Sequence, residues 1–268
     1  MIKSFIFLFS FLLWASVAEE KAFKVEHAPK KVEKVIADVF TPSNKVLNRA
    51  KNISYEFKVK LSSMNMGKLS YKINKENDKV FTEAYLKTSS FYDFIFKIRD
   101  KLTSIYSTST AGTLNFNFKK KEGRRFSDVK MIFTDGKIEY SENWKKKKRT
   151  GKKEKVIDLK GVKHLDILNI INIILFSQNE LKKDMKFNLA LKDKNYVVVI
   201  ENIQNTKRIF KKKELPAVVY TLKTFRGKEA QDKGSFEIVV VPGDKPLFLE
   251  IKGRLKVGKL LGKLENVY

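Results

Sequence analysis

Hydrophobic and polar residues alternate along most of the chain beyond residue 52. From Ile53 to Leu61, apolar residues occupy the odd positions, and Ser, Glu or Lys occupies the even ones. An alternation with a period of two residues predicts a strand with one buried face and one solvated face. The pattern recurs at residues 68–74, 80–87, 113–119, 126–134, 137–141, 185–192, 196–202, 217–225, 235–241, 247–252 and 254–260.

Short turns between these segments indicate antiparallel pairing. Asp135-Gly136 suits a hairpin turn with positive φ, and Pro242-Gly243-Asp244 joins the segments on either side of it. Strands joined by short turns form antiparallel sheets, and a sheet of this size must curl or close to bury its apolar face. The predicted fold class is therefore mainly β: a large curved antiparallel sheet or barrel-like fold with one or two short helices packed on it.

Two segments break the alternation and predict those helices. In residues 91–106 the apolar residues recur at helical spacing. Residues 166–176 are almost continuously apolar, and Asp166 is placed to cap the first turn, which favours a helix buried on most sides, although the isoleucines also suit a central strand. We expect this helix to plug the concave face of the sheet or one mouth of a barrel. The candidate apolar pocket consists of Phe94, Ile98, Ile170 and Ile174.

The first eighteen residues have the pattern of a secretory signal peptide. Lys3 precedes an uncharged run over residues 4–17, and Ser16-Val17-Ala18 supplies the small residues that signal peptidase needs. Because the run is short for a membrane span, we expect cleavage after Ala18, a periplasmic location and no stable transmembrane span; the alternative is an uncleaved anchor. Residues 19–51 are expected to form a mobile lead-in with one short helix at 31–40, and residues 52–268 a single β-rich domain.

Composition limits the chemistry of the exported domain. The chain contains no cysteine, which excludes disulfides, thiolate nucleophiles, zinc–thiolate sites and lipidation at a cleavage-site cysteine. It contains 56 Lys and Arg against 30 Asp and Glu, a net charge of +26 that becomes +25 if Lys3 leaves with the signal peptide. Export argues against nucleic acid and favours an anionic lipid or lipopolysaccharide surface, an acidic glycan or an envelope protein. A lysine-rich proteome without a specific partner explains the charge equally well.

The densest charge lies in a predicted loop at about residues 142–156. Like charges this close together do not pack, so the segment is expected to be solvated. It would dock on anionic headgroups, where each basic residue contributes about 1 kcal/mol, with Trp144 at the interface; the alternative is a soluble hairpin tip without a function. Residues 119–121, 124–125 and 211–213 add to the same field if they share a face. The candidate binding residues are Trp144, Lys145, Lys146, Lys147, Lys148, Arg149, Lys152 and Lys153.

The sequence lacks the usual catalytic and metal-binding patterns. His27 and His164 are too few and too far apart for a histidine metal site, and neither a GxSxG nor an HExxH motif occurs. Arg99 and Asp100 are interpreted as a structural ion pair where the first helix meets the sheet. We therefore expect no enzymatic activity, no cofactor and no metal.

Several segments from residue 50 onward occur in a characteristic order. They are Tyr55-Glu56-Phe57 followed by Met66-Gly67-Lys68-Leu69, FIFKIRDK at 94–101, FTDGK at 133–137, the apolar run 166–175, a strand pair near 185–202, and the pieces 236–238, 245–247 and 257–260. In this order the chain resembles an exported bacterial family known only as the domain of unknown function numbered 3108. The resemblance implies an exported, mostly β protein of the cell envelope, and it carries over no catalytic residue.

Three classes of function remain. The expected one is a non-enzymatic periplasmic protein that binds a hydrophobic or anionic envelope ligand, such as an acyl chain held between the sheet and the buried helix. The alternative is a structural or scaffolding component of an envelope assembly, joined through strand edges or the basic loop. A carboxylate-dependent hydrolase ranks last, because the spacing of the acidic residues singles out no acid–base pair.

Overall fold

One antiparallel sheet makes up most of the protein. The computed structural model describes residues 47–159, 162–177, 180–226, 229–255 and 258–268. Within these residues, fourteen strands are hydrogen-bonded in the order β8-β7-β6-β5-β4-β3-β2-β1-β14-β13-β12-β11-β10-β9. The strands are β1 (Ile53–Leu61), β2 (Met64–Glu76), β3 (Lys79–Thr88), β4 (Arg99–Ser107), β5 (Gly112–Glu122), β6 (Arg125–Thr134), β7 (Lys137–Lys146), β8 (Arg149–Asp158), β9 (Lys186–Leu191), β10 (Lys194–Phe210), β11 (Lys213–Arg226), β12 (Glu229–Val241), β13 (Leu247–Leu255) and β14 (Gly258–Val267).

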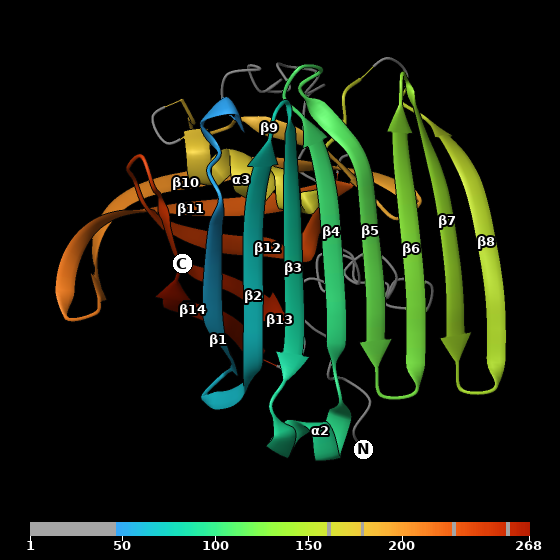
Figure 1. Ribbon diagram of the computed structural model, residues 1–268, viewed down its shortest axis with the longest axis horizontal. Coiled ribbons are helices and arrows are strands. Elements are labelled where there is room, and N and C mark those ends of the chain that lie inside the picture. The colour runs from blue at the N-terminus through green and yellow to red at the C-terminus, as the bar shows by residue number, and fades with distance from the viewer. Residues whose placement is uncertain (1–46, 160–161, 178–179, 227–228, 256–257) are drawn as a thin grey trace, which may run out of the picture.

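The sheet folds back on itself and becomes barrel-like. Strands β1–β8 form the front layer in Figure 1, and β9–β14 cross behind it at a steep angle. The layers are joined where β1 pairs with β14, from Tyr55↔Val267 to Leu61↔Leu260. Strands β8 and β9 stand at the two ends of the hydrogen-bonded order, so the described sheet is strongly curved without being a closed cylinder. The predicted fold class is confirmed.

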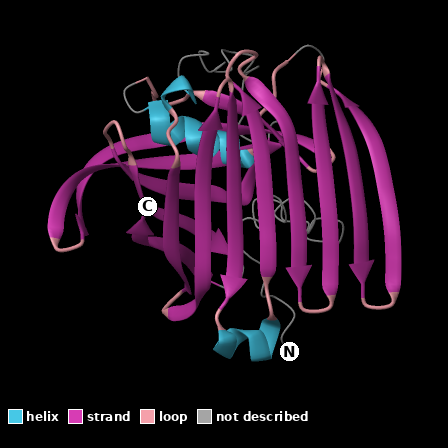
Figure 2. Ribbon diagram, viewed as in Figure 1, coloured by secondary structure: helices cyan, strands magenta, loops and turns pink. Residues whose placement is uncertain are grey.

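Helix α3 (Ile167–Ser177) lies between the two layers (Figure 2). All 11 of its residues are buried. A helix that is apolar on most sides must be enclosed by protein, and the sheet encloses this one. The Asp166 carboxylate caps it, because Oδ1 accepts the backbone N–H groups of Leu168 at 2.8 Å and Asn169 at 3.2 Å. The predicted buried helix and its cap are both confirmed.

Polar groups inside the barrel fix α3 to the front layer. The Tyr71 hydroxyl donates to Asn172 Oδ1 at 2.7 Å, and Asn172 Nδ2 donates to Thr82 Oγ1 at 2.7 Å. The Tyr55 hydroxyl donates to the Pro246 carbonyl at 2.6 Å and so connects β1 to the turn before β13. Buried hydrogen bonds of this kind select one packing arrangement, because leaving any partner unpaired would cost about 1–3 kcal/mol.

The helix predicted over residues 91–106 is wrong for most of its length. Only α2 (Ser90–Phe96) is helical, and the chain is extended from Lys97 (φ −75°, ψ 126°) into β4. From residue 99 onward the buried positions alternate, with Asp100, Leu102, Ser104 and Tyr106 all facing the interior. Pairing with β3 and β5 thus determined the structure here, and the helical spacing of the apolar residues was coincidental.

The candidate apolar pocket is also wrong, because its members lie in different places. Phe94 is 96% exposed on the outer side of α2, whereas Ile98, Ile170 and Ile174 are buried. No residue of α2 is buried, so this helix lies outside the barrel (Figure 2). The isoleucines of α3 pack against the sheet, and Phe94 does not reach them.

Two predicted hairpin turns are confirmed, whereas several strand boundaries differ from the prediction, such as that of β10, which continues to Phe210. Asp135-Gly136 connects β6 to β7 with φ 73° at Gly136, and residues 242–246 connect β12 to β13, as predicted. The predicted last strand at 254–260 is shifted, because β13 continues to Leu255 and β14 begins at Gly258. The predicted basic loop at 142–156 is a β-hairpin, in which only Lys147 and Lys148 lie between β7 and β8.

The N-terminal segment is described only from residue 47. The predicted signal peptide, the short helix at 31–40 and His27 lie outside the described residues. A 3₁₀ turn, η1 (Leu47–Arg49), precedes β1, and both Leu47 and Ala50 are buried in the core, so the packed domain begins before residue 52. In the described part of the chain, no helix is long and apolar enough to cross a membrane.

Candidate anionic-surface site

The connections of the front layer alternate between two ends of the barrel. Because β1 to β8 are sequential and antiparallel, the β1–β2 turn, α2, the β5–β6 turn and the β7–β8 turn all lie at one end, along the lower edge of Figure 1. We call this the basic end. The turns at 77–78, 108–111 and 135–136 lie at the opposite end. Topology thus gathers segments that are up to about 85 residues apart in the sequence.

The tip of the β7–β8 hairpin is the most strongly charged part of the basic end. Lys145, Lys146, Lys147, Lys148 and Arg149 are all exposed, and within the described chain none of these five side chains has an ion-pair partner. The charges do not prevent strand formation, because successive side chains on a strand point to opposite faces. Lys147 adopts φ 57°, which the tight turn requires.

The β5–β6 turn extends this charge across the neighbouring strands. Arg125 lies directly opposite Lys146 in the β6–β7 ladder, and Arg124 precedes it in the turn; both arginines are exposed. Adjacent strands are about 4.8 Å apart, so these groups lie within about 10 Å of the hairpin tip. The sequence made the contribution of residues 124–125 conditional on a shared face, and the pairing of Arg125 with Lys146 meets that condition for Arg125.

The other predicted members of the site are engaged elsewhere. Trp144 lies across from Gly151, and its indole is so close that a Cβ at Gly151 would meet ring carbon Cζ2 at 2.4 Å. Lys152 forms an ion pair with Glu154 at 2.7 Å, and Lys153 forms one with Asp193 at 2.6 Å. The eight predicted residues therefore separate into five exposed tip residues and three that pack or pair within the sheet.

Lys153 belongs to a polar seam between the two edges of the sheet, in which Lys153 on β8 pairs with Asp193 and Glu142 on β7 pairs with Lys192. Lys192, in the β9–β10 turn, lies 3.5 Å from Glu142 on β7, whose carboxylate also accepts the hydroxyl of Tyr140 at 2.6 Å. Burial alone would raise the pKa of Glu142, but Lys192 and the hydrogen bonds outweigh burial and hold it below the ordinary value. The seam joins β7 and β8 to the β9–β10 hairpin through side chains, so we assign it a structural role.

Helix α2 is attached to the basic end by one hydrogen-bonded clasp. The Arg99 guanidinium donates to both carboxylate oxygens of Asp93, and the Thr88 hydroxyl donates to Asp93 Oδ1 at 2.5 Å. The hydrogen bonds from Arg99 and Thr88 lower the pKa of Asp93. The expected role of Arg99, an anchor where helix meets sheet, is correct, but its partner is Asp93 and not Asp100. A single helix over residues 91–106 does not predict this pairing, because it places Asp93 and Arg99 six residues apart on one helix.

Asp100 is buried beside a second carboxyl group. Asp100 and Glu122 both face the interior near the basic end, where Lys120 Nζ lies 2.8 Å from Glu122 Oε1. Asp100 Oδ1 accepts the backbone N–H of Lys121 at 3.0 Å. Burial and the nearby Glu122 carboxyl raise the pKa of Asp100 to about 8. Burial and the neighbouring carboxyl group thus favour the protonated form of Asp100.

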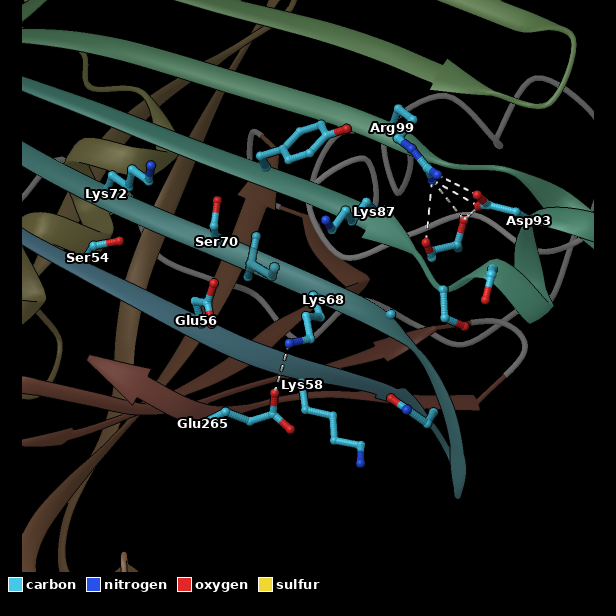
Figure 3. Close-up of a pocket in the computed structure, with 17 residues that line it drawn as sticks. Ser54, Glu56, Lys58, Lys68, Ser70, Lys72, Lys87, Asp93, Arg99 and Glu265 are labelled. Carbon is cyan, nitrogen blue, oxygen red and sulfur yellow. Dashed lines mark hydrogen bonds and ion pairs between the residues drawn. The ribbon is translucent and has the colours of Figure 1, made fainter. Parts of the chain in front are cut away.

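A polar groove of about 810 Å³ lies on the outer face of β1–β3 (Figure 3). Its floor consists of outward side chains of these strands, and the Arg99–Asp93 clasp closes one end. Lys68 pairs with Glu265 across the groove at 3.7 Å. Gly67 is needed here, because a Cβ would lie 2.0 Å from the Lys87 carbonyl oxygen. The groove is not among the predicted sites, although the outward Lys58, Lys68, Lys72 and Lys87 that line it are visible in the sequence.

Potential metal ligands do not cluster in the described residues. No group of three or more His, Asp or Glu side chains there could hold a metal ion. His164 Nδ1 lies 2.9 Å from the Val162 carbonyl oxygen, and burial lowers its pKa. The nearby Asp166 has its carboxylate occupied by the helix cap and by Ser104 and Thr113. We therefore assign His164 a structural role in the segment that leads into α3.

Comparison with known proteins identifies the fold and nothing beyond it. No protein-family model matches the chain, and no curated protein matches it. Among solved structures, it is similar to the crystal structure of a β-barrel-like protein of domain of unknown function DUF1849 from Brucella abortus. The TM-score is 0.53 with 14% sequence identity, over 81% of this chain and 97% of that chain. The protein therefore shares a β-barrel-like architecture with that structure.

Proposed function

We propose that this is a non-enzymatic exported protein of the cell envelope that binds an anionic surface through its basic end. One observation carries the proposal: the five exposed, consecutive basic side chains of residues 145–149 lie beside Arg124 and Arg125 at one end of a rigid sheet. Near an anionic lipid surface each such residue contributes about 1 kcal/mol, so several acting together produce substantial binding. An anionic phospholipid or a lipopolysaccharide phosphate supplies the complementary charge.

The interior supports this assignment over an acyl-chain carrier. A carrier needs apolar space beside its helix, but every residue of α3 is buried against protein and its polar groups are bonded to the front layer. Two hollows, the groove over β1–β3 and one over β6–β8, lie on the outer face of the sheet. The anionic half of the expected ligand class therefore fits the structure better than the hydrophobic half.

Strand β8 is the feature that would favour a scaffold. It stands at one end of the hydrogen-bonded order, and a partner strand can extend such an edge. Lysines along an edge strand are, however, a common protection against pairing, and β8 carries Lys152, Lys153 and Lys155. The charge that fits an anionic surface thus also discourages edge-to-edge assembly.

A vesicle-binding experiment with matched charge removal tests the proposal. The tip variant is Lys147→Asn, Lys148→Ser and Arg149→Ser, and the control is Lys211→Asn, Lys212→Asn and Lys213→Ser in the β10–β11 turn. Asn is used at Lys147, Lys211 and Lys212 because these residues have φ of 57°, 47° and 66°. Both variants lose three charges from a hairpin turn.

In flotation with phosphatidylglycerol vesicles at low salt, we expect the tip variant to lose affinity on the order of 100-fold and the control about 10-fold or less. Equal losses in both variants would show that only net charge matters, and would contradict a dedicated site. Mass spectrometry of the protein recovered from cells tests export separately, since an N-terminus at Glu19 is expected.

A further inference from the structure

Helix α2 presents an apolar face to solvent at the basic end. Phe91, Phe94 and Ile95 are 72%, 96% and 52% exposed, and their spacing places them on one side of the helix. Tyr92 and Phe96, on the other side, pack against the core. An exposed face of this kind has a cost in water that a partner would remove.

Other exposed apolar side chains lie at the same end. Met64 begins β2 and Phe126 lies next to the start of β6, and they are 47% and 40% exposed. Of the ten large hydrophobic side chains that are exposed in the described chain, the basic end holds five: Met64, Phe91, Phe94, Ile95 and Phe126. The concentration is therefore regional, and it coincides with the concentration of charge.

The apolar helix is held in place before any partner arrives. The clasp of Arg99, Asp93 and Thr88 ties its middle to the sheet, and the Ser89 N–H donates to the Met66 carbonyl at 2.9 Å. On its far side, the Gly123 N–H donates to the Lys97 carbonyl at 2.7 Å. A preorganised surface loses little conformational entropy when it binds.

We propose that α2 inserts Phe91, Phe94 and Ile95 into an anionic phospholipid bilayer while the basic turns beside it bind the headgroups. The inference rests on the proposed function. It identifies the bilayer as the anionic surface and orients the barrel with its basic end toward that bilayer. The Gly123–Lys97 hydrogen bond places α2 directly beside the β5–β6 turn, from which the row of Arg124, Arg125 and residues 145–149 continues.

The charge and the apolarity together favour a bilayer. An apolar patch ringed by cations fits a surface with anionic headgroups above hydrocarbon, and α2 is too short to span it. A soluble phosphate compound would leave the phenylalanines in water. A soluble acidic glycan would do the same, so neither explains both features.

Removing the apolar face tests insertion separately from charge. The variant is Phe91→Ser with Phe94→Ser, and the control is Val156→Ser with Ile209→Ser, two residues that are 62% and 69% exposed elsewhere. With phosphatidylglycerol vesicles at 0.5 M salt, where charge attraction is screened, we expect the α2 variant to lose at least tenfold in affinity and the control less than twofold. Circular dichroism of each variant checks that the barrel is intact.

A single-site probe tests the depth of α2 directly. Because the chain contains no cysteine, Ile95→Cys takes an environment-sensitive fluorophore at one position, and Thr110→Cys places the same label at the opposite end. Vesicles should shift the emission of the label at residue 95 to shorter wavelength and leave the label at residue 110 unchanged.

The outcomes separate this inference from the proposed function. Binding at low salt that is insensitive to the phenylalanine variant, with the label at residue 95 still in water, overturns insertion and leaves charge binding intact. Absence of binding to anionic vesicles at any salt concentration overturns both. Self-association that disappears in the phenylalanine variant, without an effect on vesicles, would identify the face as a contact between copies of this chain and also overturn insertion.

Discussion

The two ends of the front layer are formed by the same strands but have different connections. At the opposite end, the turns bind each other: the Asp78 carbonyl accepts the Thr108 N–H at 2.7 Å, and the Asp78 carboxylate accepts the Ser109 hydroxyl at 2.9 Å. At the basic end, the β5–β6 and β7–β8 turns extend exposed Arg and Lys side chains, and α2 exposes phenylalanines. The opposite end is closed by its own contacts, whereas the basic end has polar and apolar groups available for a partner.

The buried carboxyl groups of β4 and α3 show the same contrast. Near the opposite end, Asp166 receives hydrogen bonds from Ser104, Thr113 and Asn169 and from two backbone amides of α3. Near the basic end, Asp100 has the Lys121 amide and faces the carboxyl of Glu122. One acid is fully engaged in holding a helix, and the other is held in an unfavourable pairing. The basic end is therefore where we expect the fold to be least optimised for stability.

Asp166→Ala should have the largest effect on stability. It removes the cap of α3 and leaves the buried hydroxyl donors of Ser104 and Thr113 without their acceptor, so we expect a loss of about 3–5 kcal/mol in the free energy of unfolding. Urea denaturation followed by circular dichroism measures it. Asp166→Asn keeps an oxygen for the cap and should lose about half as much. The exposed Glu139→Ala is the control, and a similar loss there would contradict the special position of Asp166.

Gly67→Ala should damage the basic end, whereas Gly112→Ala should leave the opposite end intact. An added Cβ at Gly67 would lie 2.0 Å from the Lys87 carbonyl oxygen, so β2 and β3 must separate, and we expect a loss of about 3 kcal/mol. At Gly112 the nearest atom would be 4.0 Å away, and alanine there should be neutral or stabilise by under about 1 kcal/mol. Equal midpoints of urea denaturation for the two variants would refute this difference.

The sequence predicted those parts of the fold that depend on local patterns. The alternation of residues 53–61 and the apolar run capped by Asp166 have one consistent structural solution, and both were found. The helix predicted over 91–106 is wrong because the apolar residues of α2 and the alternating apolar residues of β4 follow one another without a turn residue, so two different periods overlap. The hydrogen-bonded pairing of β4 with β3 and β5 decides where the helix ends and the strand begins. Strand pairing of this kind cannot be read from a single sequence.

The candidate site was partly predictable for a similar reason. The basic run at 145–149 is visible as a charge cluster, but its place beside Arg125 depends on the β6–β7 register. In a sequential antiparallel sheet the connections alternate between the two ends, so the number of strands between α2 and the β7–β8 turn places both at the same end. That number is correct only if β4 and β8 are recognised as strands. A loop over residues 142–156 predicts neither that α2 and the β7–β8 turn lie at the same end nor that Trp144 packs on Gly151.

Asp100→Asn should stabilise the protein, and more so at higher pH. The folded-state pKa of Asp100 is raised to about 8 from an ordinary value of 3.8, so the folded protein holds a proton that the unfolded chain releases. Stability from this group therefore falls as pH rises from about 4 to 8. Asparagine resembles the protonated acid and can still accept the Lys121 N–H. We expect the variant to gain about 2 kcal/mol more at pH 8 than at pH 6, as measured by urea denaturation. A gain that does not change with pH would show that the proton is not held there.

Gly151→Ala should have the smallest effect and separate packing from charge at the hairpin tip. The new methyl group would lie 2.4 Å from Cζ2 of Trp144, and the indole must swing away from the sheet toward water. A side chain yields more easily than backbone, so we expect a loss of under about 1 kcal/mol. In a Trp14→Phe background, where Trp144 is the single tryptophan, its emission should shift to longer wavelength. Thr150→Ala, on the other face of β8, should leave the emission unchanged. Because residues 145–149 are intact in both variants, vesicle binding should be the same; a loss in Gly151→Ala alone would mean that packed Trp144 contributes to the anionic-surface site.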